Sequence, residues 1–372
     1  MTGPRPPHSG DPPHRPAPPA AGPAAPPPAK SRRRPGLPAF VDPYVAALVA
    51  TVALAALLPA TGAAQTATRT ASEAAIALLF LLYGVRLSTR EALAGLRRVR
   101  LHVLILLSTF VLFPLLGLAA LRLAPGLLSP QLAAGLLFLC VVPSTVQSSV
   151  ALTAAAGGDI AAAICAGTYS SLVGLAATPL LAAWLIGPGT GLSADGLLRI
   201  AGQLLAPFVL GQLLRPRLGA FVTRNRRALG FLDRGSILLV VYAAFSAGVE
   251  QGIWNRVTPG RMLGLLAVLA VLLAVALTGT HAVARLARLD GPARTAAVFC
   301  GSQKSLANGL PMAAVLFGGR AALAVLPLML YHQMQLMVCA ALAGRWSRRA
   351  AGEPAPRTAP AAPPAPPAPT GG

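Results

Sequence analysis

Charged side chains are scarce in this sequence, and their scarcity decides its class. Only 11% of the 372 residues are charged, whereas 55% are hydrophobic. An ordinary soluble protein carries about one charged residue in four. The composition therefore excludes a soluble globular domain and predicts an all-α polytopic membrane protein in contact with lipid.

Acidic side chains are the scarcest charged group. Ten Asp and Glu stand against 31 Lys and Arg, which gives a net charge of +21. This charge does not indicate nucleic acid, because the basic residues stand in short segments between apolar runs and no nucleic-acid-binding motif is present. The sequence also lacks a nucleotide-binding loop, a metal-binding Cys pair and a convergent set of acid, base and nucleophile. We expect neither an enzyme nor a cofactor.

What the sequence does contain is a series of hydrophobic runs that approach the length needed to cross a membrane, about 20 residues. The ten predicted spans are residues 40–59, 71–85, 101–121, 131–156, 160–186, 197–214, 231–249, 262–284, 293–317 and 321–343. They form a first half, 40–187, and a second half, 188–345. The tails, 1–39 and 346–372, are rich in Pro and Ala and are expected to be disordered.

The basic residues test this count of ten. With a cytoplasmic amino terminus, 24 of the 31 basic residues lie on the cytoplasmic side and only six on the other. Cytoplasmic loops carry such an excess of Lys and Arg. The pattern predicts a multi-pass protein of the inner or plasma membrane with both termini in the cytoplasm.

The two halves carry a faint internal repeat. The Gly-Gly pair at residues 157–158 recurs at 318–319, and at the same offset Ser144 corresponds to Ser305. Because each half holds five spans, such a repeat must be inverted. Inverted repeats with interrupted helices at corresponding positions are typical of secondary transporters, whose binding site lies near the middle of the membrane.

Polar residues interrupt the fourth and ninth spans. Pro143 removes a backbone donor and should free the carbonyls near Leu139 and Cys140 for a ligand. Gly301 and Pro311 indicate a similar break in the ninth span. The candidate substrate- or ion-binding residues are Ser144, Thr145, Gln147, Ser148 and Ser149 in the fourth span, and Ser302, Gln303, Lys304, Ser305 and Asn308 in the ninth. The alternative is that these polar side chains serve helix packing alone.

Lys304 is the most unusual of these residues, because it is the only lysine outside the amino-terminal tail. A lysine in the middle of a bilayer costs about 3 kcal/mol on insertion scales, so other interactions must compensate for it. A cationic centre favours an anionic substrate. Alternatively, the lysine is fixed to helix carbonyls for structural reasons only.

Three motifs resemble one known family. They are residues 78–88, residues 143–149 with the Gly-Gly pair that follows, and residues 299–312. Together they resemble the bile acid:sodium symporter superfamily, in particular the divergent branch with bacterial SBF-like proteins and the calcium-regulator relatives of yeast and vertebrates. The resemblance implies ten helices in a panel domain and a core domain, with helices four and nine unwound and crossing.

The resemblance also implies ion ligands. In sodium-coupled members, helix four supplies hydroxyl and amide ligands, matching Ser144, Thr145 and Ser148, and helix five adds hydroxyls, for which Thr168 is a candidate. In those members helix nine also carries a carboxylate, and the corresponding residue of this chain is Phe299. None of the ten acidic residues of this chain lies within a predicted span away from its ends, so sodium binding is doubtful. We expect the ammonium group of Lys304 to take the place of sodium, or to bind and release a proton.

These features favour a secondary transporter of a small organic anion that works by alternating access. Transport should be independent of sodium or coupled to protons. The alternative is a membrane regulator of ion homeostasis, including calcium, that transports nothing itself.

Overall fold

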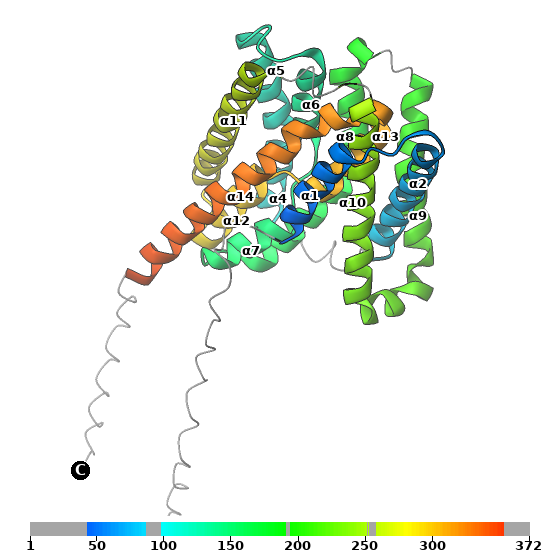
Figure 1. Cartoon of the computed structure of the whole chain (residues 1–372). Helices are drawn as coiled ribbons and strands as arrows, with labels where there is room; N and C mark the ends of the chain where they lie inside the picture. The colour runs from blue at the N-terminus through cyan, green and yellow to red at the C-terminus, as the bar shows by residue number, and fades with distance from the viewer. Residues whose placement is uncertain (1–42, 87–97, 191–193, 251, 253–257, 353–372) are drawn as a thin grey trace, which may run out of the picture. The chain divides into compact units, whose positions relative to one another are not determined.

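The computed structural model describes residues 43–86, 98–190, 194–250, 252 and 258–352 (Figure 1). Helices account for nearly all of these residues. The predicted disordered tail 1–39 lies outside them, as does most of the predicted carboxy-terminal tail.

The described helices follow one another along the chain. In chain order they are α1 (Pro43–Leu57), α2 (Gly62–Arg86), α4 (Val99–Leu107), the π-helix η2 (Ser108–Leu112), α5 (Phe113–Leu123), α6 (Pro130–Val141), α7 (Gln147–Ala155), α8 (Ile160–Thr190), α9 (Ala194–Arg224), α10 (Arg226–Glu250), α11 (Pro259–Leu286), α12 (Gly291–Ser302), α13 (Leu306–Phe317), the 3-10 helix η4 (Gly318–Arg320) and α14 (Ala321–Gly352).

Several helices are long and apolar enough to cross a membrane. Within the described residues these are Gly62–Arg86, Val99–Leu123, Ile160–Gly187, Arg226–Glu250, Pro259–Leu286 and Ala321–Arg348. Large apolar side chains also point outward, among them Leu213, 70% exposed, and Leu263, 68% exposed. An outward-facing apolar surface suits lipid rather than water. The protein is therefore a multi-pass membrane protein, while the number of ten crossings stays a prediction.

Some helices continue beyond the hydrophobic runs that predicted them. The sequence places a loop between the sixth and seventh spans, but α9 continues to Arg224 and α10 begins at Arg226. Likewise α14 reaches Gly352, seven residues past the predicted end of the second half. Basic, helix-favouring side chains extend these helices after the apolar pattern stops, so hydropathy alone underestimates their length.

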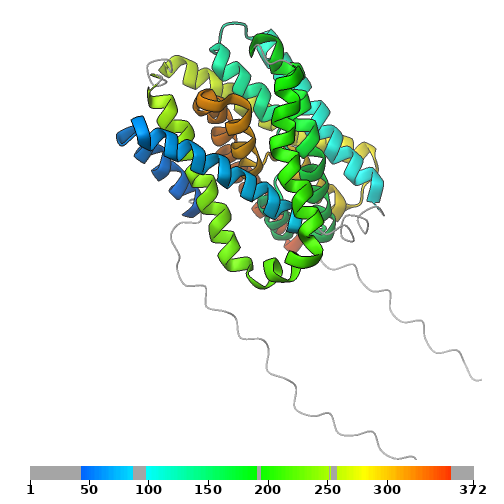
Figure 2. The same cartoon turned by 90° about the vertical axis from the view of Figure 1, so that its right-hand side faces the viewer.

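Two groups can be distinguished among the helices from residue 43 onward, which belong to one unit in which α13 and α14 contact members of both groups. Helices α1, α2, α9 and α10 contact one another, and α2 lies against α9 along much of its length, as the two views agree (Figures 1 and 2). Glycines make this close contact possible: a Cβ atom on Gly84 would lie 2.1 Å from the carbonyl oxygen of Phe208, and one on Gly211 would lie 2.1 Å from that of Leu81. The second group, built around α12, includes α4, α7, α8 and α11.

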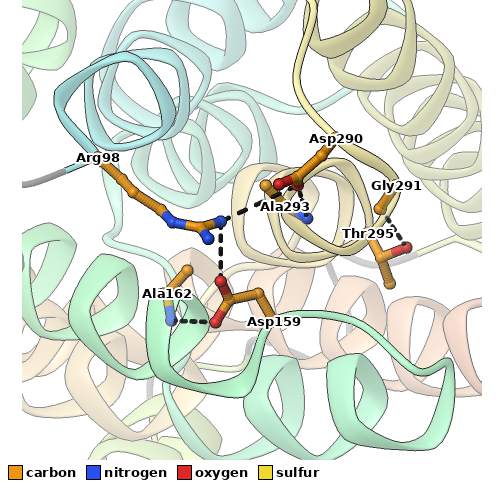
Figure 3. A network of polar contacts seen from close by, with 7 residues as sticks. All are labelled: Arg98, Asp159, Ala162, Asp290, Gly291, Ala293 and Thr295. Atoms are coloured by element: carbon orange, nitrogen blue, oxygen red, sulfur yellow. Dashed lines mark hydrogen bonds and ion pairs between the residues drawn. The ribbon is translucent and has the colours of Figure 1, made fainter. Parts of the chain in front are cut away.

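One ion-pair network joins three helix ends of the second group (Figure 3). Arg98, directly before α4, lies 2.8 Å from a carboxylate oxygen of Asp159 and 4.0 Å from one of Asp290. Each carboxylate also caps a helix, because Asp159 accepts a hydrogen bond from the backbone N–H of Ala162 and Asp290 from that of Ala293. The network thus fixes the starts of α4, α8 and α12 at one end of this group.

The fourth and ninth predicted spans are each broken into two helices. The first consists of α6 and α7 with residues 142–146 between them, and the second of α12 and α13 with residues 303–305 between them. The Gly-Gly pairs form the turns that follow, and the first glycine of each pair has a positive φ, 70° at Gly157 and 53° at Gly318. Glycine adopts this conformation without steric cost. The predicted interruption of both spans is confirmed. In the ninth span it lies at residues 303–305, however, and Pro311 does not mark it, because this proline lies inside α13.

Candidate functional site

The two helix breaks contact each other directly. The backbone N–H of Ser305 donates a hydrogen bond to the carbonyl oxygen of Pro143 at 2.9 Å. The hydroxyl of Ser148 donates to the side-chain oxygen of Gln303 at 2.8 Å. Exposed backbone groups are tolerated in a membrane only where protein or a cavity satisfies them. Each break therefore supplies part of the hydrogen bonding that the other lacks.

Lys304 joins the two breaks through its ammonium group. This fully buried side chain donates hydrogen bonds to the carbonyl oxygens of Cys140 at 2.8 Å, Val142 at 2.9 Å and Thr109 at 2.9 Å. It also lies 4.1 Å from the centre of the Phe113 ring, a cation–π contact. An ammonium group has three donors, so its hydrogen-bonding capacity is filled. These interactions explain how a charged lysine is tolerated in an apolar environment.

The carbonyl of Thr109 can accept this bond because of a local helix defect. In η2 the backbone N–H of Phe113 donates to the carbonyl oxygen of Ser108, so it does not reach Thr109 as in an α-helix. The next residue, Pro114, has no N–H to offer. The Thr109 oxygen is thus left without a backbone partner, and Lys304 supplies one.

Side chains satisfy the other carbonyls at the breaks. Thr178 donates to Val141 at 2.8 Å, and Tyr331 donates to Ser302 at 2.8 Å. Gln335 of α14 both accepts from the N–H of Lys304 at 2.8 Å and donates to its carbonyl at 2.9 Å. The Cys140 carbonyl is thus free of helix bonding as expected, because the N–H of Ser144 bonds Ser170 instead, but the ammonium of Lys304 takes the place expected for a ligand. The nearby Leu139 carbonyl is approached by the N–H of Val142.

A cavity of about 760 Å³ lies between the two helix groups, next to the breaks. Its walls come from α1, α2, α9 and α10 on one side and from α7, α8 and α13 on the other. Helices α7 and α13 both begin at this cavity, with Gln147 and Ser305 in its wall. Helix amino termini carry partial positive charge, so this wall favours an anionic group.

The structure separates the predicted site residues into two sets. The cavity wall contains Thr145, Gln147, Thr168, Ser305 and Asn308. Outside that wall, in the hydrogen-bonded contacts around the breaks, lie Ser144, Ser148, Ser149, Ser302, Gln303 and Lys304. Thus the lysine lies behind the cavity rather than in it, and it would act on a substrate only through the helices that it holds.

Sequence reasoning missed the charged residues of the cavity. Those in its wall are Arg86, Arg226, Arg227, Asp233 and Arg234. Arg86 of α2 and Asp233 of α10 form an ion pair. The sequence indicated that no carboxylate is near the crossing, yet Asp233 shares the cavity with Ser305 and Asn308. Asp233 was missed because it lies at a span end in a basic stretch; a lone acid among arginines is the signal that could have found it.

The position of the sodium-ligand carboxylate is apolar in this chain. Phe299 is fully buried, and its ring centre lies 5.4 Å from that of Trp346. Within the described ranges, no group of three or more His, Cys, Asp or Glu side chains could hold a metal ion. Phe299 itself therefore packs against an aromatic neighbour and carries no carboxylate.

Comparison with known proteins identifies the family of this chain. A sequence model of the SBF-like CPA transporter family matches residues 42–348. The chain belongs to this family. The resemblance to the SBF-like branch of the bile acid:sodium symporter superfamily is thereby confirmed.

Relatives of this SBF-like chain cover nearly its whole helical part. An uncharacterised protein of Pseudomonas aeruginosa is 48% identical over 311 residues, which cover 83% of this chain and 93% of the relative. YfeH of Escherichia coli, provisionally named a symporter, is 44% identical over 312 residues, 83% of this chain and 94% of YfeH. Sodium/bile acid cotransporter 7 of Mus musculus is 29% identical over 278 residues, 72% and 81% of the two chains. Family membership implies a membrane transporter of a small molecule rather than an enzyme.

Proposed function

We propose that this protein is a secondary transporter that moves a small organic anion by alternating access. The observation that carries this proposal is the cavity between the two helix groups, whose wall contains two helix amino termini and four arginines. Together these groups give the cavity a positive potential. Apolar side chains such as Phe80 and Leu175 line the rest of the wall and suit the carbon skeleton of an organic anion.

Alternating access needs two groups of helices that move as units. The first group is held together by close backbone contact at Gly84 and Gly211. The second is held by Lys304 between the breaks and by Arg98 between helix ends. A cavity between two separately braced groups can open to either side when they shift against each other.

Transport in this proposal does not use sodium. The carbonyl oxygens of Cys140, Val142 and Thr109 form the kind of oxygen cluster that a hard cation seeks, but the ammonium of Lys304 already occupies it. Phe299 offers no carboxylate to balance a second cation there. The ammonium of Lys304 thus stays in this carbonyl cluster throughout, whereas a sodium ion would fill it only when bound.

The same proposal includes the membrane arrangement. Ten crossings as an inverted repeat of five plus five helices would place both termini in the cytoplasm, and the excess of basic residues favours the inner or plasma membrane. The three helix ends joined by Arg98, Asp159 and Asp290 all belong to predicted cytoplasmic loops, and this common placement supports the assignment.

The experiment is counterflow of a labelled organic-anion panel in proteoliposomes. We expect at least one carboxylate or sulfate ester to exchange, and we expect exchange to fall about tenfold or more in Gln147→Ala and Asn308→Ala. Gln65→Ala, which removes an amide away from the cavity, should exchange normally. If the wild type exchanges none of the panel while a membrane partner co-purifies with it, the proposal is wrong and the regulator remains.

A further inference from the structure

The ion pair between Arg86 and Asp233 lies where two cavities meet. Both residues line the cavity beside the helix breaks and a second cavity of about 840 Å³, which continues between α2, α9 and α10. Both side chains are partly exposed, 32% for Arg86 and 17% for Asp233. A solute that passes from one cavity to the other passes this pair.

Asp233 is the single acidic residue in either cavity wall among the described residues. The charged or titratable side chains that surround it are Tyr44 from α1, Tyr83 and Arg86 from α2, Arg215 from α9, and Arg226, Arg227 and Arg234 from α10. Arg234 also lies over the ring of Tyr44, 5.6 Å from its centre. One carboxylate cannot neutralise the five arginines that line the two cavities. Its role is therefore a specific pairing, and its partner is Arg86.

Only half of the Asp233 carboxylate is used in this pairing. Oδ2 contacts Arg86, whereas Oδ1 is buried and has no hydrogen-bond partner. A buried acceptor without a partner is costly when the group is ionised. A protonated carboxyl group would lower this cost, and it would also release Arg86.

We propose that Arg86 is the anion-binding residue of the cavity and that Asp233 is its resident counter-ion, which the anionic group of the substrate displaces. This inference rests on the proposed transport of an organic anion. When the substrate binds Arg86, Asp233 loses its partner and takes up one proton from the aqueous side of the cavity. When the substrate leaves, Asp233 loses the proton and pairs with Arg86 again. The same exchange couples the movement of one anion to one proton.

This arrangement has an unusual consequence for affinity. In the empty protein the ionised carboxylate of Asp233 competes with the substrate for Arg86, so the competition weakens as pH falls. Removing the carboxylate should therefore tighten anion binding rather than weaken it. Because a partly exposed ion pair is weak, removing the competition of Asp233 for Arg86 should lower the Kd of the anion about fivefold.

The test measures anion binding to the purified full chain in detergent between pH 5.5 and 8.5, with a ligand that exchanges in the panel above. For the wild type we expect Kd to rise with pH. For Asp233→Asn we expect a Kd about fivefold lower at pH 8.5 and nearly independent of pH. Arg86→Gln should bind at least tenfold more weakly at every pH. Glu73→Gln, which removes an exposed carboxylate of α2 paired with Arg69, should match the wild type.

The outcomes separate the two proposals. If the wild type binds no anion of the panel, the transport proposal fails and this inference with it. If the wild type binds an anion but Asp233→Asn retains its Kd and its pH dependence, the cavity binds anions without the exchange, and only the inference is wrong. A merely structural ion pair would instead lower the thermal midpoint of Asp233→Asn and leave the pH profile of binding unchanged, which also contradicts the inference.

Discussion

The ammonium nitrogen of Lys304 lies 2.8 Å from the carbonyl oxygen of Cys140, a residue 164 positions earlier in the chain. One end of this contact belongs to the break between α12 and α13, and the other to the end of α6 before its own break. The contact joins two interrupted helices through a covalently attached cation. It explains how buried carbonyl groups at the break after α6 are satisfied in an apolar environment.

Replacing Lys304 by a side chain of similar length without charge should destabilise the protein. Lys304→Met leaves three buried carbonyls without donors, and each costs about 1–3 kcal/mol. We expect the thermal midpoint in detergent to fall by at least about 5 °C, measured by tryptophan fluorescence. Arg320→Met, which removes an exposed charge in η4, should leave the midpoint unchanged. Equal midpoints for the two variants would show that the carbonyls have other donors.

Removing most of the Lys304 side chain should create a cation site. Lys304→Ala vacates the space among the carbonyls of Thr109, Cys140 and Val142, where a sodium ion has oxygen ligands on several sides. We expect 100–300 mM NaCl to raise the midpoint of this variant relative to the same concentration of choline chloride, and to have no such effect on the wild type. A variant that responds equally to both salts would argue that the lysine does not stand in the place of an ion.

The sequence predicts much of this arrangement, because the relevant signals are local. Pro143 and the polar residues around Lys304 mark the breaks, since no stable membrane-spanning helix tolerates such residues without a reason. Ser305 and Asn308, two of the candidate residues in the ninth span, both lie in the cavity wall. Helix bounds agree to within a few residues wherever the apolar run ends at a turn, as for α11.

What the sequence does not predict depends on distant contacts. Thr109 accepts from Lys304 only because the π-helix before Pro114 leaves its carbonyl unpaired, and no residue pattern indicates this bond. The pairing of Arg86 with Asp233 needs α2 and α10 to be adjacent. Both residues were assigned to loops or span ends because hydropathy does not distinguish a charged loop from the charged end of a helix that borders a cavity.

The contact between α2 and α9 should tolerate no added methyl group. Gly84→Ala places a Cβ against the backbone of α9, where neither helix can yield easily, so we expect a loss of about 3 kcal/mol or more and reduced folded protein in membranes. Gly235→Ala in α10 adds the same group where nothing lies within 4 Å. It should stabilise the protein slightly, because alanine favours a helix. Size-exclusion profiles and thermal midpoints of the two variants compare them directly; similar profiles would contradict the close contact.

The proposed orientation predicts opposite accessibility for two exposed positions. Thr61, between α1 and α2, should face the outside, and Arg285, at the end of α11, should face the cytoplasm. A membrane-impermeant maleimide should label Thr61→Cys in intact cells and Arg285→Cys only after permeabilisation. Labelling of both variants in intact cells would contradict the odd number of crossings, seven, that is predicted between them.

Uptake of a labelled organic anion into proteoliposomes, with imposed sodium or proton gradients, shows which ion drives transport. Because the ammonium of Lys304 occupies the carbonyl cluster, we predict that an inward sodium gradient leaves the initial rate unchanged. An inward proton gradient should raise the rate and drive accumulation, and uptake should be lost in Lys304→Ala measured without sodium. Accumulation driven by sodium in the wild type would contradict the account.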